Sequence, residues 1–173
     1  MESTTQIFLQ LMPAGGSRIV QGEAHAQGFE KSIELENFSF DLTVEQSVQK
    51  AGKKNTSNLQ REPVRCSKIF DKSSLVLAQL MNARVKFDWA RLFVDQQLQD
   101  EIGKDPNPIL VIDLLDGFIS NFSLRASEGK VSATIREDLT LSYVNFKVWY
   151  CPRAKVGQYR AAEVTYETQY ENK

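Results

Sequence analysis

The chain has 173 residues, about the length of one domain, and this is enough to bury roughly two thirds of the unfolded surface in one core. Its apolar fraction of 42% and charged fraction of 25% are typical of a soluble globular protein. A net charge of −1 provides no overall attraction to nucleic acid or anionic lipid and little repulsion between copies. We therefore expect a single domain over residues 1–173, with neither nucleic acid nor a membrane as a partner.

The first residues do not have the pattern of a secretory leader. Glu2 precedes the apolar run where a leader has a basic cluster, and the run Ile7–Met12 is short and interrupted by Gln10. Other apolar runs, such as Ile109–Ile112, are far too short to cross a bilayer. We expect a cytoplasmic protein that, if it is exported, uses a route without a cleaved leader.

Beta-type segments recur along the chain and are separated by turn signals such as Gly15-Gly16, Asp105–Pro108 and Asp116-Gly117. Short gaps between about eight strands favour an antiparallel barrel or sandwich over a parallel sheet with crossover helices. The predicted strands are Gln6–Leu11, Phe29–Leu42, Val64–Phe70, Lys86–Val94, Ile109–Leu115, Phe118–Leu124, Val131–Tyr150 and Arg160–Thr168.

Two of the predicted strands change phase in the middle. Strand side chains alternate with a period of two, so such a change means either a bulge or a strand whose halves bury opposite faces. We expect each half to pack against something different, which gives the sheet two apolar sides. The residues in opposite phase are Leu139, Leu141 and Tyr143 against Val144, Phe146, Val148 and Tyr150, and Ile33 and Leu35 against Phe38, Phe40 and Leu42.

One segment predicts a helix. Residues 71–74 offer side-chain caps, and the apolar residues that follow, Leu77, Leu80 and Met81, share one helical stripe. We expect a short helix over residues 73–82, packed on the β domain. A second helical signal, Gln96–Ile102, lies between two predicted strands and is either a helix or an extended hairpin loop.

A long polar segment, residues 43–63, contains few apolar residues. It is either a disordered excursion or a functional arm. Fixing the backbone costs about 1–2 kcal/mol per residue, so an ordered arm of this composition needs a partner surface to lie on. We predict that Lys50, Lys53, Lys54 and Arg61 meet acidic groups on that partner.

The sequence offers weak candidates for catalysis. The one histidine, His25, has no G-x-S-x-G elbow or reactive-cysteine signature with it. Two carboxylate pairs, Glu34 with Glu36 and Asp113 with Asp116, have spacings that arise freely in any sequence. We expect no catalytic residues and no enzyme.

Other candidate sites are equally weak. Cys66 and Cys151 have no metal-site spacing, so we interpret them as reduced, packed thiols, and we expect no cofactor and no metal. Phe87, Trp89 and Phe93 alternate with charged residues, as in a stacking platform for single-stranded nucleic acid. The acids among them favour core packing or a subunit contact instead.

Four stretches in collinear order resemble the Hcp (hemolysin-coregulated protein) family, the tube subunits of type VI secretion systems. They are GEAHAQGFEKSIELENFSF at residues 22–40, KIFDKSSLVLAQLMNA at 68–83, PNPILVIDLLDGFISNFSL at 106–124 and REDLTLSYVNFKVWY at 136–150. The third stretch is similar to the hairpin that precedes the last strands of the family.

The resemblance implies a squat β-barrel with one flanking helix, six copies in a ring, and rings stacked into a hollow tube. A contractile sheath surrounds that tube, a spike protein caps it, and small effectors are carried in its lumen. The arm at residues 43–63 matches the position of the family's extended loop, which lies on adjacent subunits. As ring-interface residues we predict the four basic residues of the arm together with Phe38, Phe40, Phe146 and Val148.

Three other functions stay open at this stage. A bacteriophage-type tail tube protein needs the same barrel and arm. A monomeric β-barrel that binds a small apolar ligand requires an internal cavity and an arm that can be deleted. A hydrolase would depend on His25.

Overall fold

The computed structural model describes residues 3–46, 57–98, 108–128, 134–150 and 164–167, which contain eleven strands and one helix. In chain order these elements are β1 (Ser3–Pro13), β2 (Ile33–Leu35), β3 (Asn37–Ser39), β4 (Leu42–Gln46), β5 (Ser57–Arg61), β6 (Val64–Ile69), α1 (Lys72–Asn82), β7 (Phe87–Leu98), β8 (Pro108–Ser127), β9 (Thr134–Ser142), β10 (Asn145–Tyr150) and β11 (Val164–Glu167).

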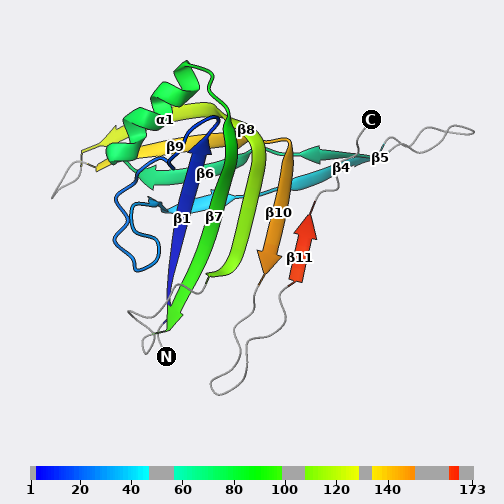
Figure 1. The fold of residues 1–173 in the computed structure, drawn as a ribbon, viewed down its shortest axis with the longest axis horizontal. Coiled ribbons are helices and arrows are strands. Elements are labelled where there is room, and N and C mark those ends of the chain that lie inside the picture. Colours follow the sequence, from blue (N-terminus) through cyan, green and yellow to red (C-terminus); the bar gives the residue numbers. More distant parts are fainter. Residues whose placement is uncertain (1–2, 47–56, 99–107, 129–133, 151–163, 168–173) are drawn as a thin grey trace, which may run out of the picture.

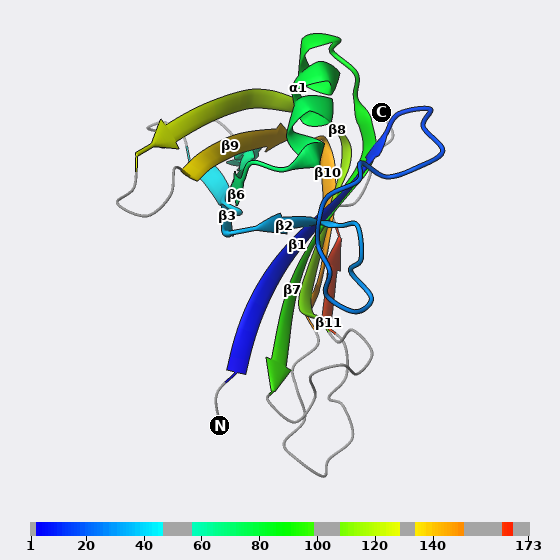
Figure 2. The same ribbon diagram turned by 90° about the vertical axis from the view of Figure 1, so that its left-hand side faces the viewer.

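Most strands belong to two antiparallel sheets that share the long strand β8 (Figure 1). The first half of β8 pairs with β7 and β10, and the second half pairs with β9. The first sheet has the order β2-β1-β7-β8-β10-β11 and the second the order β8-β9-β6-β3. Figure 2 shows the second half of β8 and β9 turning away from β1, β7 and β10. The expected mainly β, antiparallel fold is confirmed, but the strands pair into an open arrangement and not into a closed barrel.

The predicted turn at Asp116-Gly117 is wrong, because β8 runs through it as one strand. Asp116 has a left-handed φ of 52°, and the pairing of β8 with β9 shifts register between Ile119 and Asn121. A Cβ on Gly117 would lie 2.1 Å from Phe87 Cζ, so only glycine fits here. The residues that signal a turn instead bend the strand from one sheet into the other.

The phase change in residues 137–150 has a different origin from the one expected. The chain bends between β9 and β10, at Tyr143 and Val144, so these are two strands. Leu141 of β9 and Phe146 of β10 are both fully buried in the same apolar core. Likewise, β2 and β3 are separate short strands that flank Glu36, and their apolar residues contact that same core. The expectation that each half packs against something different is therefore wrong.

The described parts of the predicted arm form a two-stranded ribbon. β4 and β5 pair in antiparallel register from Leu42 with Arg61 to Gln46 with Ser57. Figure 1 shows this ribbon projecting from the body of the molecule. Residues 47–56, with Lys50, Lys53 and Lys54, lie outside the described residues.

The predicted helix is confirmed as α1. Asp71 is the N-cap and accepts a hydrogen bond from the backbone N–H of Ser73, and Ser74 completes a capping box. Leu77 is fully buried, and Leu80 and Met81 pack beside it on the core. Of the two alternatives for residues 96–102, the helix is wrong for residues 96–98, which continue β7 as a strand, and residues 99–102 lie outside the described residues. In the part of the chain described here, no helix is long and apolar enough to cross a membrane.

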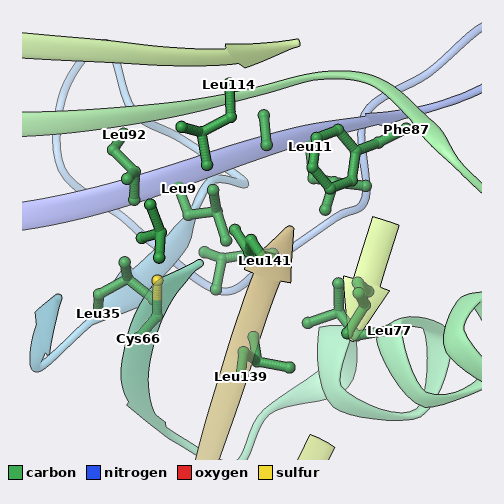
Figure 3. Close-up of a cluster of buried hydrophobic side chains, with 14 of the residues drawn as sticks. Leu9, Leu11, Leu35, Cys66, Leu77, Phe87, Leu92, Leu114, Leu139 and Leu141 are labelled. Atoms are coloured by element: carbon green, nitrogen blue, oxygen red, sulfur yellow. The ribbon is translucent and has the colours of Figure 1, made fainter. Parts of the chain in front are cut away.

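The main core lies between the two sheets and beneath α1 (Figure 3). Leu9, Leu92 and Leu114 supply it from the first sheet, and Leu139 from the second. Burying a side chain of this size contributes about 1.5–3 kcal/mol. A smaller cluster covers the other face of the first sheet, where Phe29 stacks on Phe8 with ring centroids 4.4 Å apart.

Candidate assembly interface

The predicted interface residues fall into two groups in the structure. Arg61 is exposed at the end of β5, whereas Phe38, Phe40 and Val148 are half-buried against the protein's own core. Phe146 is fully buried there, so its side chain cannot reach a neighbouring copy. We therefore withdraw Phe146 from the interface, because the bend before β10 turns it inward.

Phe146 lies at the centre of an aromatic cluster. Its ring contacts Phe40 edge-on at 5.1 Å between centroids and Tyr166 of β11 at 5.7 Å. Tyr143 packs edge-on against Phe146 at 6.0 Å, and its burial raises the pKa of the phenol to about 12. These contacts hold the root of the ribbon and β11 against the core.

Large apolar side chains remain exposed on several parts of the surface, and the sequence analysis did not single them out as a group. Leu75 and Val76 lie outside the helical stripe that enters the core, so the helical periodicity of the sequence could have predicted their exposure. Exposed apolar surface of this kind marks protein contacts. The exposed residues are Leu42, Val44, Ile69, Leu75, Val76, Phe118, Leu124, Ile135, Val144, Tyr150 and Tyr166.

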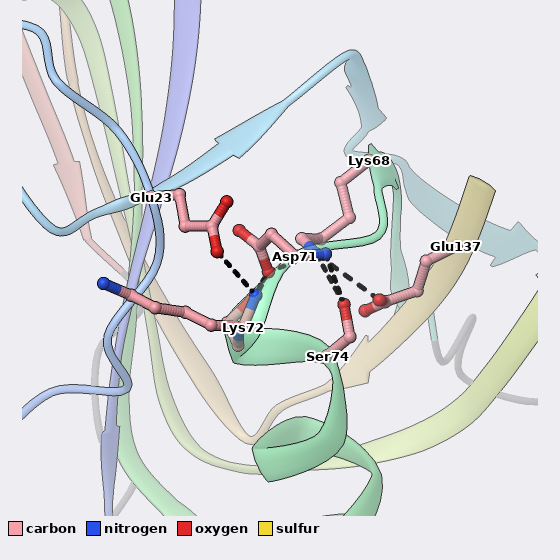
Figure 4. Close-up of polar contacts among 7 residues, drawn as sticks. Glu23, Lys68, Asp71, Lys72, Ser74 and Glu137 are labelled. Carbon is pink, nitrogen blue, oxygen red and sulfur yellow. Dashed lines mark hydrogen bonds and ion pairs between the residues drawn. The ribbon is translucent and has the colours of Figure 1, made fainter. Parts of the chain in front are cut away.

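A buried ionic network holds the start of α1 on the second sheet (Figure 4). Lys68 of β6 is fully buried, and its Nζ lies 2.8 Å from Asp71 Oδ1 and 3.3 Å from Glu137 Oε2 of β9. The same Nζ donates to Ser74 Oγ at 3.0 Å. The network therefore joins β6, β9 and α1 through one ammonium group, a role that the sequence pattern did not reveal.

Asp71 predicts how stability depends on pH. Burial opposes its ionisation, but hydrogen bonds from Lys68 and Ser73 outweigh burial and hold its pKa below the ordinary value. Its stabilising effect is thus complete above the unfolded pKa of about 3.9 and is lost as pH falls through the folded pKa. We expect the urea concentration at the unfolding midpoint to decrease as the pH is lowered below about 4. This decrease should be smaller in Asp71→Asn, because its side chain cannot ionise. Identical pH profiles for the two proteins would contradict this.

The face of the first sheet that lies opposite the main core also carries an ion pair between aromatic rings. Asp113 accepts two hydrogen bonds from Arg91, at 2.5 and 2.7 Å, and they hold the pKa of Arg91 above its ordinary value. The guanidinium lies 5.5 Å from the Trp89 ring and 5.7 Å from the Trp149 ring. Phe87 points into the core instead, so the alternating residues do not form one stacking platform.

His25 lines a cavity of about 540 Å³ with Glu23, Glu34, Glu36 and Asp71. Glu36 pairs with Arg136 at 3.2 Å, and Glu23 accepts a hydrogen bond from the backbone N–H of Lys72 at 3.1 Å. Over the described residues, no group of three or more histidine, cysteine, aspartate or glutamate side chains could hold a metal ion. Glu36 is thus held by β9, and Glu23 is held by the start of α1.

The thiol of Cys66 is part of the core. It is 2% exposed, and burial raises its pKa to about 12. Its interpretation as a packed thiol is consistent with this position, whereas Cys151 lies outside the described residues.

The outer face of the second sheet is polar. Two shallow cavities of about 570 and 560 Å³ share Asn37, Ser67, Arg125 and Asp138. Hydrogen bonds from Ser67 and Arg125 hold the pKa of Asp138 below its ordinary value. This face therefore differs in chemistry from the exposed apolar surface around α1.

Comparison with known structures identifies the fold. A structure of a type six secretion system protein has a TM-score of 0.75 and 16% identity, and covers 95% of this chain and 96% of its own. Hcp1 from Salmonella typhimurium has a TM-score of 0.65 and 19% identity over 93% and 91% of the two chains. The secreted protein Hcp3 from Pseudomonas aeruginosa has a TM-score of 0.62 and 12% identity over 96% and 100%. No curated protein matches the sequence.

The family model described as "Type VI secretion system effector, Hcp" matches residues 8–150. This match runs from the middle of β1 to the end of β10 and therefore includes most of the chain. The expected resemblance is thus confirmed, and the chain belongs to the Hcp family of type VI secretion system proteins.

Proposed function

We propose that this protein is a structural tube subunit, which forms six-membered rings that stack into the inner tube of a type VI secretion system. The observation that carries the proposal is the amount of exposed apolar surface at separate places. Val44 on the ribbon, Leu75 on α1 and Tyr166 on β11 are 52%, 63% and 56% exposed. Further copies of the chain would cover these side chains.

The arrangement of strand edges supports a ring. Among the described residues, β11 pairs only with β10, and Ser3–Gln6 of β1 pairs only with β7. Strands at different margins of the described sheet favour repeated head-to-tail contacts, and such contacts either close into a ring or form a filament. An obligate interface of this kind buries about 2,000 Å² or more.

Membership of the family extends the proposal to export. The subunit would be made in the cytoplasm and expelled when a contractile sheath shortens around the tube. A spike protein would cap the tube, and small effectors would be carried in the lumen of the tube. The role is therefore assembly and transport, and no catalytic residue is assigned.

Native mass spectrometry and negative-stain imaging of the purified protein test the proposal. We expect particles of six copies at micromolar concentration, with a ring-shaped projection and a central channel. A protein that stays strictly monomeric under these conditions would contradict the proposal.

A further inference from the structure

The long strand β8 passes from one sheet to the other at a bend, residues 116–118. Gly117 is the last residue of β8 that pairs with β7, opposite Phe87, and Phe118 is the first that pairs with β9, opposite Ser142. Among the strands that the structure describes, β8 alone pairs in both sheets. The bend therefore sets the direction in which the second sheet leaves the first (Figure 2).

Backbone conformation and packing hold the bend in one shape. Asp116 has a left-handed φ of 52°, a conformation that aspartate accepts and β-branched residues resist. A Cβ on Gly117 would lie 2.1 Å from Phe87 Cζ and 2.3 Å from the backbone oxygen of Ser142. Phe87 belongs to the first sheet and Ser142 to the second. The bend thus fits closely against both sheets.

Two serine hydroxyls support the bend on the side of the second sheet. The pairing of β8 with β9 shifts register between Ile119 and Asn121, so Ser120 forms a bulge. Its Oγ donates to the backbone oxygen of Thr140 at 3.3 Å and accepts a hydrogen bond from Ser142 Oγ at 3.0 Å. A bulge increases the local bend of a strand, and these hydrogen bonds hold it against β9.

Exposed apolar side chains lie on both sides of the bend. Tyr150 and Tyr166 are exposed on β10 and β11 of the first sheet, and Leu124 and Ile135 are exposed on β8 and β9 of the second. Lys68 fastens α1 to the second sheet. Figure 1 shows α1 above the left side of the first sheet and β11 at its right edge. A head-to-tail contact that joins these groups would therefore use both sheets of the protomer.

We propose that the bend at Asp116 and Gly117 sets the number of copies in the ring. Each copy in a closed ring is rotated from the next by one full turn divided by the copy number, so six copies need about 60° and seven about 51°. The angle between the sheets enters this rotation directly, and a change of about 10° alters the copy number. This inference rests on the proposed ring and assigns its closure to one place in β8.

Variants of Asp116 test the inference, because they change the backbone preference at an exposed position. Asp116→Val resists the left-handed region, whereas Asp116→Gly combined with Ser120→Ala loosens the bend without strain. Asp116→Asn is the matched control, since asparagine accepts this conformation and only the charge is lost. By native mass spectrometry we expect one ring size for the unmodified protein and the control. The other two variants should give mixed ring sizes or open chains.

A distance measurement follows the angle itself. In a Cys151→Ser background that retains buried Cys66, spin labels at Leu124→Cys and Tyr166→Cys report the separation of the two sheets. The measurement is made at a protein concentration low enough for rings to dissociate. We expect the same narrow distribution in the protein with Asp116 and in the Asp116→Asn control. The distribution should shift or broaden in the variants with altered ring sizes.

The outcomes separate this inference from the proposed function. One unchanged ring size in the Asp116→Gly and Ser120→Ala double variant would overturn the inference alone, even if Asp116→Val does not fold. Altered ring sizes without a change in the measured distance would assign the effect to a direct contact of Asp116 and would also overturn it. The absence of rings in the unmodified protein would instead overturn the proposed function, on which the inference rests.

Discussion

Replacing Lys68 with alanine is expected to cost about 3–5 kcal/mol of the free energy of unfolding, because it leaves buried carboxylates without a counter-charge. Glu137 is fully buried, and the Asp71 side chain is 13% exposed. Both would have to protonate or draw in water. The measurement is urea unfolding at neutral pH and one fixed protein concentration, since association also stabilises the folded state.

The control for this prediction removes both charges of the pair. Lys68→Met combined with Glu137→Leu replaces the fully buried ion pair with apolar groups and should recover part of the lost stability, because the buried Glu137 charge is gone and only Asp71, which is 13% exposed, stays without its counter-charge. A double variant as unstable as Lys68→Ala would show that the loss came from packing. A loss below about 1 kcal/mol in Lys68→Ala would contradict a buried network at this position.

Phe146→Ala is expected to destabilise the folded protomer by about 3–5 kcal/mol, because it removes a fully buried ring and leaves a cavity. Phe146 is 0% exposed and contacts the rings of Phe40 and Tyr143. Tyr166→Ala is the matched control, since it deletes an aromatic ring that is 56% exposed. It should cost under about 1.5 kcal/mol.

The two aromatic variants separate a core role from an interface role. Unfolding should be followed at a protein concentration low enough for rings to dissociate. If Phe146 belonged to the ring interface, its loss would weaken assembly and leave the unfolding of the separate protomer nearly unchanged. That result would contradict the position of Phe146 in the core.

Local patterns in the sequence were sufficient for the helix and for most strands. The caps at Asp71 and Ser74 and the stripe through Leu77 define α1 because capping and helical periodicity depend only on near neighbours. Strand alternation in residues 6–11 and 64–70 likewise marks β1 and β6. The four family-like stretches also indicate the family from the sequence alone, because they occur in collinear order over most of the chain.

Only the tertiary structure decided how the phase changes are resolved and which side chains are free for assembly. Asp116-Gly117 has the composition of a turn, but the packing of Gly117 against Phe87 makes it a bend within β8. Nothing local marks Lys68 as buried, because its partner Glu137 is supplied by β9, which is distant in sequence. Phe146 and Leu75 are both apolar, and only the direction of the chain at each position buries one and exposes the other. Burial is set by contacts between segments distant in sequence, and no local pattern encodes those contacts.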